Sequence, residues 1–182
     1  PYSVSGVTDR SYHGTGLIVD AERGYVVTDR NTVPVAMGDV RLTFSGAIEI
    51  PARVVYIHPL HNLAVVAYDP ALIGETPVRS AQLDPAPLKP GDKVWAIGLR
   101  ADQKVASQAT EVSSVDSASF PLSRTLQFRD SNLETVSLVN PPDYDGVLVN
   151  KNGKVAALWS SFAYQGGRDV NQTNLSGSVD LV

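Results

Sequence analysis

Short runs in which apolar and polar residues alternate are the feature that most constrains the fold of this chain. Val40, Leu42 and Phe44 would face one side of a strand while Arg41 and Thr43 face the other, which is the period of a half-buried strand. No helical stripe of useful length competes with this pattern. Similar runs ending at turn residues predict strands over residues 16–20, 25–29, 40–44, 48–57, 63–69, 93–99, 105–115, 125–130, 133–139, 146–150 and 154–162. So many short strands predict an antiparallel all-β barrel or sandwich.

The Pro-rich segment 84–92 divides the chain into two halves of similar strand content. We therefore expect two small β-barrels packed together, one over residues 1–84 and one over 85–165. Residues 166–182 are polar and rich in Gly and Ser, so we expect a polar tail or loop there. The first residues carry neither an initiator Met nor an apolar leader, and we interpret the chain as a fragment of a longer one.

Composition excludes several classes of function. The chain has 15 Lys and Arg against 19 Asp and Glu, and no basic run, so nucleic acid and anionic membrane are poor candidate partners. It contains no cysteine, which removes thiolate nucleophiles and thiolate metal sites. The histidines are His13, His58 and His61, and their spacing predicts neither a metal site nor a cofactor. The compartment stays undetermined.

Four ordered segments resemble the trypsin-like domain of the HtrA/Deg serine proteases. GTGLIVDAERGYVVTDRNTV (14–33) is similar to the opening of that domain, and NLETVSLVNPPDYDGVLVNKNGKV (132–155) is similar to its nucleophile block; residues 53–69 and 88–98 match the segments between. The resemblance implies a trypsin-like double six-stranded β-barrel, the chymotrypsin/HtrA fold, with a cleft between the barrels. The most similar region is the second, inactive protease region of the duplicated Deg-type and nuclear mediator of apoptosis proteins.

The resemblance places non-catalytic residues at all three triad positions. Asn31 stands where the family has its histidine base, Asn62 where it has the orienting aspartate, and Tyr144 where it has the serine nucleophile. An Asn carboxamide cannot take a proton near neutral pH. A tyrosine hydroxyl titrates at about pH 10, and without a base beside it the hydroxyl is a poor nucleophile for an amide.

The oxyanion-binding position is altered as well. Pro142 stands where the family has a glycine that donates its N–H, and proline has no N–H to donate. Removing one such donor costs on the order of 10²- to 10³-fold in rate. Asp145 replaces a second glycine and would put a carboxylate where negative charge develops. The catalytic machinery of the family is therefore expected to be lost.

These departures imply a catalytically inactive serine-protease-like domain, a pseudoprotease, within a larger HtrA/Deg-type protease. Its expected role is structural, in assembly, or in binding a peptide or protein. The neighbouring protease and PDZ domains of the same polypeptide are candidate partners, as are a second copy of the chain and an extended peptide bound by strand addition. The candidate binding cleft consists of Asn31, Asn62, Asp143, Tyr144 and Asp145.

Some alternatives stay open at this point. Tyr144 could be a recognition residue or an aromatic packing residue that fills the place of the serine. Asn31 and Asn62 could bond each other. A hydrolase with a rearranged catalytic set is the alternative function, and the set that can be written down combines His61 and Asp69 with Ser160 or Ser161.

Overall fold

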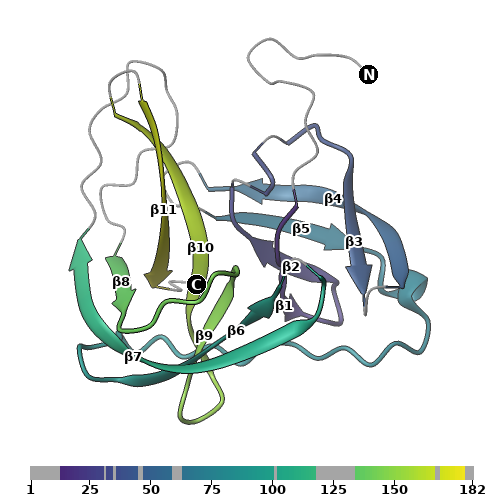
Figure 1. The fold of residues 1–182 in the computed structure, drawn as a ribbon. Coiled ribbons are helices and arrows are strands. Elements are labelled where there is room, and N and C mark those ends of the chain that lie inside the picture. The colour runs from purple at the N-terminus through teal and green to yellow at the C-terminus, as the bar shows by residue number, and fades with distance from the viewer. Residues whose placement is uncertain are drawn as a thin grey trace.

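The structure is a computed structural model that describes residues 13–30, 32–34, 36–44, 47–58, 63–100, 102–117, 134–166 and 169–178. These residues form eleven β-strands and one short 3-10 helix, arranged as two sheets (Figure 1). The all-β prediction is confirmed. Within the described ranges no helix is both long and apolar enough to cross a membrane.

The first sheet is antiparallel and has the strand order β1-β2-β5-β4-β3. Its strands pair so that apolar residues lie opposite each other: Leu42 lies opposite Ile50, and Val26 lies opposite Val66. The carboxylate of Asp69 accepts a hydrogen bond from the Ala71 N–H at 3.0 Å and begins the 3-10 helix η1. The elements are β1 (Leu17–Asp20), β2 (Tyr25–Thr28), β3 (Val40–Phe44), β4 (Ile48–Ile57), β5 (Ala64–Tyr68) and η1 (Pro70–Ile73).

The second sheet is a closed barrel with the strand order β10-β11-β8-β7-β6-β9. Strand β6 pairs with β7 on one side and with β9 on the other, where Gly98 faces Gly146. The elements are β6 (Lys93–Leu99), β7 (Val105–Ser117), β8 (Glu134–Leu138), β9 (Gly146–Asn150), β10 (Val155–Gly166) and β11 (Asp169–Ser178). The described residues thus give six strands to this barrel and five to the first sheet, one fewer than the resemblance implied there.

The expected polar tail over residues 166–182 is wrong for most of its length. Strand β11 pairs with ten residues of β10, from Ala157 to Gly166, and its Ser176 also lies opposite Val136 of β8. Strand β11 is held by backbone pairing along all of its length with β10 and at Ser176 and Gly177 with β8, so it forms without apolar alternation of its own. The predicted strand over residues 125–130 lies outside the described residues.

Each sheet encloses its own apolar core. Val26, Val66 and Ile73 belong to the first core, and Val94, Leu148 and Trp159 belong to the second. All six side chains are at most 5% exposed. Burying each of these side chains contributes about 1.5–3 kcal/mol to the free energy of unfolding. Each sheet is therefore stabilised by a core of its own.

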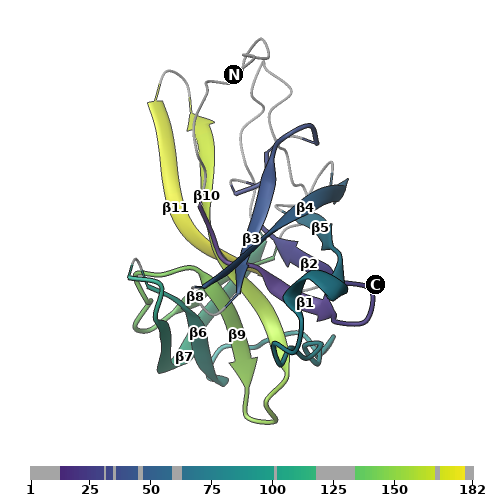
Figure 2. The same cartoon turned by 90° about the vertical axis from the view of Figure 1, so that its right-hand side faces the viewer.

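The segment between the sheets is bonded to both of them. The Ala81 N–H donates to the Ile18 carbonyl of β1 at 2.8 Å, and the Val155 N–H of β10 donates to the Gln82 carbonyl at 2.8 Å. The Asn150 side chain donates to Asp84 at 2.7 Å. Residues of β1 and β2 line one pocket together with residues of the barrel strands β6 and β9, so the first sheet meets the barrel at these strands (Figures 1 and 2). Together these bonds fix the relative position of the two sheets.

Candidate functional site

The loop between β8 and β9 is bonded along strand β7. The Val139 N–H donates to the Glu111 carbonyl at 3.0 Å, and the Gln108 side chain donates to the Asn140 carbonyl at 2.8 Å. A longer contact of 3.4 Å joins the Asn140 N–H to the Thr110 hydroxyl. These contacts place residues 141–145, which carry the predicted nucleophile position, above the barrel.

Tyr144 is buried, with 8% of its surface exposed. Its hydroxyl donates to the Ala96 carbonyl of β6 at 3.0 Å. A methyl group placed on Gly98 would approach Cδ2 of the Tyr144 ring to 2.9 Å, so the ring packs closely on a glycine. Burial raises the pKa of Tyr144; Arg100 opposes the rise and Asp143 adds to it. The hydroxyl is therefore a protonated, bonded group at neutral pH.

The residues on either side of Tyr144 differ in their exposure. Pro142 is buried, whereas Asp143 is exposed to solvent. Asp145 is half-buried and lines a pocket between the sheets. Asn31 and Asn62 lie outside the described residues, so their predicted hydrogen bond and their part in a cleft stay predictions.

The turn after β2 is organised by Asp29, which is only 6% exposed. Its carboxylate accepts hydrogen bonds from the Thr32 N–H at 3.0 Å and from the Thr32 hydroxyl at 2.7 Å. Its carbonyl accepts from the Val33 N–H at 3.1 Å. Thr32 in turn packs against Gly14, where any side chain would collide with the Thr32 hydroxyl. This turn brings a buried carboxylate to the boundary between the two sheets.

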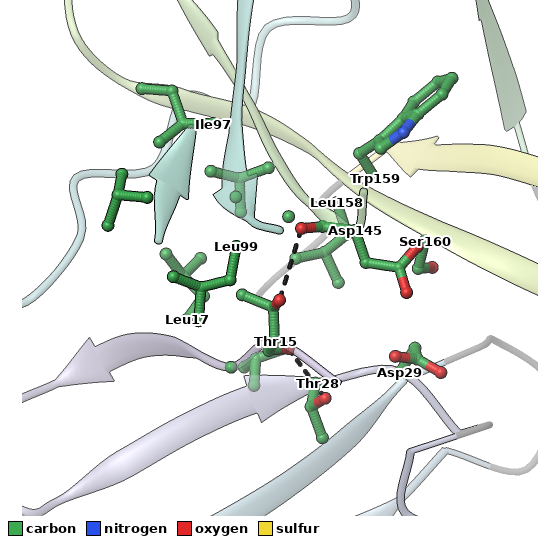
Figure 3. Close-up of a pocket in the computed structure, with 16 residues that line it drawn as sticks. Thr15, Leu17, Thr28, Asp29, Ile97, Leu99, Asp145, Leu158, Trp159 and Ser160 are labelled. Carbon is green, nitrogen blue, oxygen red and sulfur yellow. Dashed lines mark hydrogen bonds between the residues drawn. The ribbon is translucent and has the colours of Figure 1, made fainter. Parts of the chain in front are cut away.

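A pocket of about 280 Å³ lies at that boundary (Figure 3). Two hydrogen bonds cross its wall: the Thr28 hydroxyl donates to the Thr15 carbonyl at 3.0 Å, and the Thr15 hydroxyl donates to the Asp145 carbonyl at 3.4 Å. The pocket is lined by Thr15, Gly16, Leu17, Val27, Thr28, Asp29, Ile97, Gly98, Leu99, Val105, Asp145, Gly146, Val147, Leu158, Trp159 and Ser160.

The rearranged catalytic set is only partly within the described residues. Asp69 caps the helix η1, and it is not among the residues that line the pocket. Ser160 is 7% exposed and lies on the pocket wall. His61 and the side chain of Ser161 lie outside the described residues. Within the described part of the chain, no group of three or more His, Asp or Glu side chains is placed to hold a metal ion.

The resemblance implied a cleft between the barrels, and sequence reasoning named Asp145 and Ser160, but it did not single out the other residues that line this pocket. Thr15, Thr28 and Asp29 come from β2 and the segments that flank the first two strands, while Gly146 and Ser160 come from β9 and β10. No motif joins residues so far apart in the chain. The one available signal was Asp29, an acidic residue that directly follows the apolar strand β2.

Comparison with known sequences gives one family and several long relatives. The trypsin-like peptidase domain matches residues 14–158. The chain is 36% identical over 162 residues to the PDZ domain-containing protein C23G3.12c of Schizosaccharomyces pombe, covering 87% of this chain and 16% of that protein. It is 34% identical over 188 residues to the pro-apoptotic serine protease NMA111 of Eremothecium gossypii, covering 100% and 19%. It is 33% identical over 178 residues to Protease Do-like 7 of Arabidopsis thaliana, covering 90% and 16%.

Solved structures agree with this at the level of the fold. The Rv3671c protease of M. tuberculosis in its active form has a TM-score of 0.66 at 18% identity, covering 94% of this chain and 70% of that one. The HtrA-type protease AlgW with a decapeptide has a TM-score of 0.62 at 17% identity, covering 92% and 48%. The chain spans between 16% and 19% of the length of the three curated relatives named above.

Proposed function

The chain belongs to the trypsin-like peptidase family as an HtrA/Deg-like domain, and from that premise we propose that it is a member without catalytic activity. Its proposed role is that of a structural or binding module in a longer HtrA/Deg-type polypeptide. The relatives it matches include proteins named as serine proteases. The proposal is therefore that any proteolysis by the full-length protein is carried out by another domain.

The observation that carries the proposal is the state of the Tyr144 hydroxyl. At the position of the family's serine, a nucleophile must direct a lone pair at the substrate and pass its proton to a base. The Tyr144 hydroxyl instead donates to the Ala96 carbonyl of β6. Burial raises the pKa of this hydroxyl further, so the reactive anion is disfavoured at neutral pH.

The neighbouring positions support the same conclusion on chemical grounds. Pro142 has no N–H to offer an oxyanion, and Asp145 adds a negative charge close to the same loop. Asn31 and Asn62, which the resemblance places at the base and its orienting residue, cannot relay a proton. Restoring any one of these groups would leave the other steps of amide hydrolysis without a catalyst.

An apolar strip on the outer face of the barrel supports a binding role. Trp95 of β6 is 39% exposed and lies between Ala109 of β7 and Val149 of β9. Partly exposed tryptophans on a firm sheet are frequent anchors of protein interfaces. We propose that neighbouring protease and PDZ domains of the same polypeptide, or a second copy of the chain, bind such surfaces. One relative is itself named a PDZ domain-containing protein.

The direct test is labelling with a fluorophosphonate probe, which reacts covalently with activated serines. We expect no labelling of the 182-residue chain and none of the matched variant Tyr144→Ser, because no base activates a hydroxyl at that position. A saturable change in fluorescence anisotropy with an unfolded labelled peptide, without cleavage, would support the binding role. Labelling that disappears in Ser160→Ala would contradict the proposal and favour the rearranged hydrolase.

A further inference from the structure

The first sheet ends in a strand that has a neighbour on one side only. β3 (Val40–Phe44) is the last strand in the order β1-β2-β5-β4-β3, and within the described part of the chain it pairs with β4 alone (Figure 1). Among the described residues, no hydrogen bond reaches the backbone of β3 from any element other than β4 and the turn that follows β3. Every second residue of an antiparallel edge strand turns its N–H and C=O away from the sheet. The outer edge of β3 is therefore a row of backbone donors and acceptors open to another strand.

The five residues of β3 carry little of the usual protection of an edge strand. Natural edges are often blocked by proline, by a β-bulge or by charges that point inward. The sequence VRLTF contains no proline, and its residues pair with β4 in one continuous register. The irregularity of β4 lies between Val54 and Tyr56, where that strand pairs with β5 instead. Since Val, Thr and Phe also favour extended backbone, the outer edge of β3 is regular enough to pair with a further strand.

One face of β3 lies at the margin of the first core. Val40, Leu42 and Phe44 are half-buried and pack against that core. The Phe44 ring meets the Tyr68 ring edge-on, with 5.1 Å between their centroids. Side chains directly opposite each other on neighbouring strands have Cβ atoms about 4.5–5.5 Å apart. A strand added at the outer edge of β3 would therefore place every second side chain beside this face, where apolar side chains would remove apolar surface from water.

The other face of β3 carries a group of three charges. The Arg41 guanidinium contacts two carboxylates, with Nε 3.4 Å from Oδ2 of Asp39 and Nη1 3.0 Å from Oε1 of Glu49. The three side chains are between 55% and 76% exposed. Two carboxylates against one guanidinium leave an excess of negative charge. A Lys or Arg on the added strand would be attracted to this charge group, whereas an Asp or Glu would be repelled.

We propose that the outer edge of β3 binds an extended polypeptide segment by strand addition, and that this segment alternates apolar residues with Lys or Arg. Its apolar residues lie beside the half-buried face of β3, and its basic residues lie beside Asp39 and Glu49. A second copy of β3 matches less well, because pairing two copies would bring two negative charge groups together. The inference names a partner for the binding role and rests on that part of the proposed function, whereas the lack of catalysis and the surface around Trp95 are independent of it.

The first test is an NMR titration of the 182-residue chain with three peptides that are acetylated and amidated at their ends. One is Lys-Val-Lys-Val-Lys-Val-Lys, the second has Glu in place of every Lys, and the third has the composition of the first in two blocks, Lys-Lys-Lys-Lys-Val-Val-Val. We expect saturable shifts of the Arg41, Leu42 and Thr43 amides with the alternating basic peptide. Binding of the other two should be about tenfold weaker, because one loses the attraction between charges and the other loses the alternation.

The second test asks whether the backbone of the peptide forms the contact. An extended peptide turns alternate N–H groups toward its neighbour, so the alternating basic peptide is N-methylated either at every Lys or at every Val. We expect one version to bind about tenfold more weakly and the other to bind as the parent does, because one pattern alone removes the donors that face β3. Amide hydrogen exchange of alternate β3 residues should slow in the complex, since their outward N–H groups become bonded.

The third test compares two exposed aspartates with the alternating basic peptide. Asp39→Asn removes a charge beside β3, whereas Asp102→Asn removes one that pairs with Lys104 at 3.4 Å between β6 and β7. Both substitutions change the net charge by the same amount. We expect about threefold weaker binding for Asp39→Asn, as is usual for an exposed ion pair. The change for Asp102→Asn should be below about 1.5-fold, because solvent ions screen a charge that is far from the peptide.

Four results would overturn the inference. They are no amide shifts in β3 at saturating peptide, equal affinity for the alternating and the block peptide, equal losses for the two N-methylated versions, and equal losses for Asp39→Asn and Asp102→Asn. A dimer in sedimentation equilibrium that protects alternate β3 amides without any peptide would also overturn it, because the edge would then belong to a second copy. These results leave the lack of catalysis untouched, since that part of the proposed function is tested by labelling.

Discussion

Two buried tyrosines, Tyr68 in the first sheet and Tyr144 in the loop before β9, differ in what their hydroxyls do. Tyr68, at the end of β5, packs its ring edge-on against Phe44 with 5.1 Å between ring centroids, and its buried hydroxyl has no hydrogen-bond partner in the described part of the chain. Tyr144 is buried to a similar extent, but its hydroxyl donates to Ala96. Burial raises the pKa of both hydroxyls.

The difference shows that Tyr68 serves in packing, whereas Tyr144 also positions a loop. Tyr68 contributes its ring to the first core, and its hydroxyl is a polar group that the fold leaves unpaired, which is costly. The hydroxyl of Tyr144 ties the loop before β9 to the backbone of β6. The residue at the family's nucleophile position has thus become part of the barrel, and changes at the two tyrosines should have different effects.

The largest effect is expected for Tyr144→Ser, which restores the family's residue type. Removing a buried aromatic ring leaves a cavity and should lower the free energy of unfolding by about 3–5 kcal/mol. Urea denaturation followed by tryptophan fluorescence measures this loss. A loss below about 1 kcal/mol would mean that the ring does not pack as the structure places it.

Gly98→Ala probes the close contact between Gly98 of β6 and the Tyr144 ring. An added methyl group would collide with the Asp145 carbonyl and approach the ring to 2.9 Å. Overpacking of this kind costs about 1–3 kcal/mol. Thermal unfolding monitored by circular dichroism measures it, and the matched control is Ala96→Gly, which removes a methyl group two residues earlier on β6. An unchanged midpoint for Gly98→Ala would contradict the close approach.

A pair of Tyr→Phe variants isolates the two hydroxyls. Tyr144→Phe leaves the Ala96 carbonyl without this donor and should cost about 1 kcal/mol. Tyr68→Phe removes an unpaired hydroxyl, and the free energy of unfolding should stay unchanged or rise. Urea denaturation of both variants gives the comparison directly. Equal losses at the two sites would show that the two hydroxyls are equivalent after all.

The smallest effect is a dependence on alkaline pH. The ordinary pKa of tyrosine is about 10, and burial raises it in the folded state for Tyr68 and Tyr144. Above about pH 10 the unfolded chain loses these protons while the folded chain retains them, so the free energy of unfolding falls as pH rises. The double variant carrying Tyr68→Phe and Tyr144→Phe should lose less stability between pH 8 and 11 than the wild type. An equal loss would assign the alkaline effect to other groups.

Most strands were predictable because their alternation records burial on one face. The run over residues 40–44 is β3, residue for residue, and the runs at 48–57 and 93–99 are β4 and β6. Strand β11 was not predictable, because its sequence is mostly polar without alternation and it is held by pairing with β10 and β8. Such pairing depends on the rest of the barrel and leaves no local pattern.

The site was predictable in part. The loop carrying Pro142 and Tyr144 was identified from the resemblance, but the direction of the Tyr144 ring required the position of Gly98 in the neighbouring strand. The lining of the pocket was predicted only in part, because Asp29 and Asp145 are 116 positions apart in the sequence and both come to line it only when the two sheets pack together. The roles of Asn31 and Asn62 stay predictions, because both residues lie outside the described part of the chain.

The most direct test of the central claim is the hydrolysis rate of an unfolded protein such as β-casein by the purified 182-residue chain at neutral pH. The products are followed by mass spectrometry at increasing substrate concentration. The account predicts no cleavage above the buffer control for the wild type and for Tyr144→Ser. A steady, saturable rate that is retained through purification and abolished by a single substitution in this chain would contradict it.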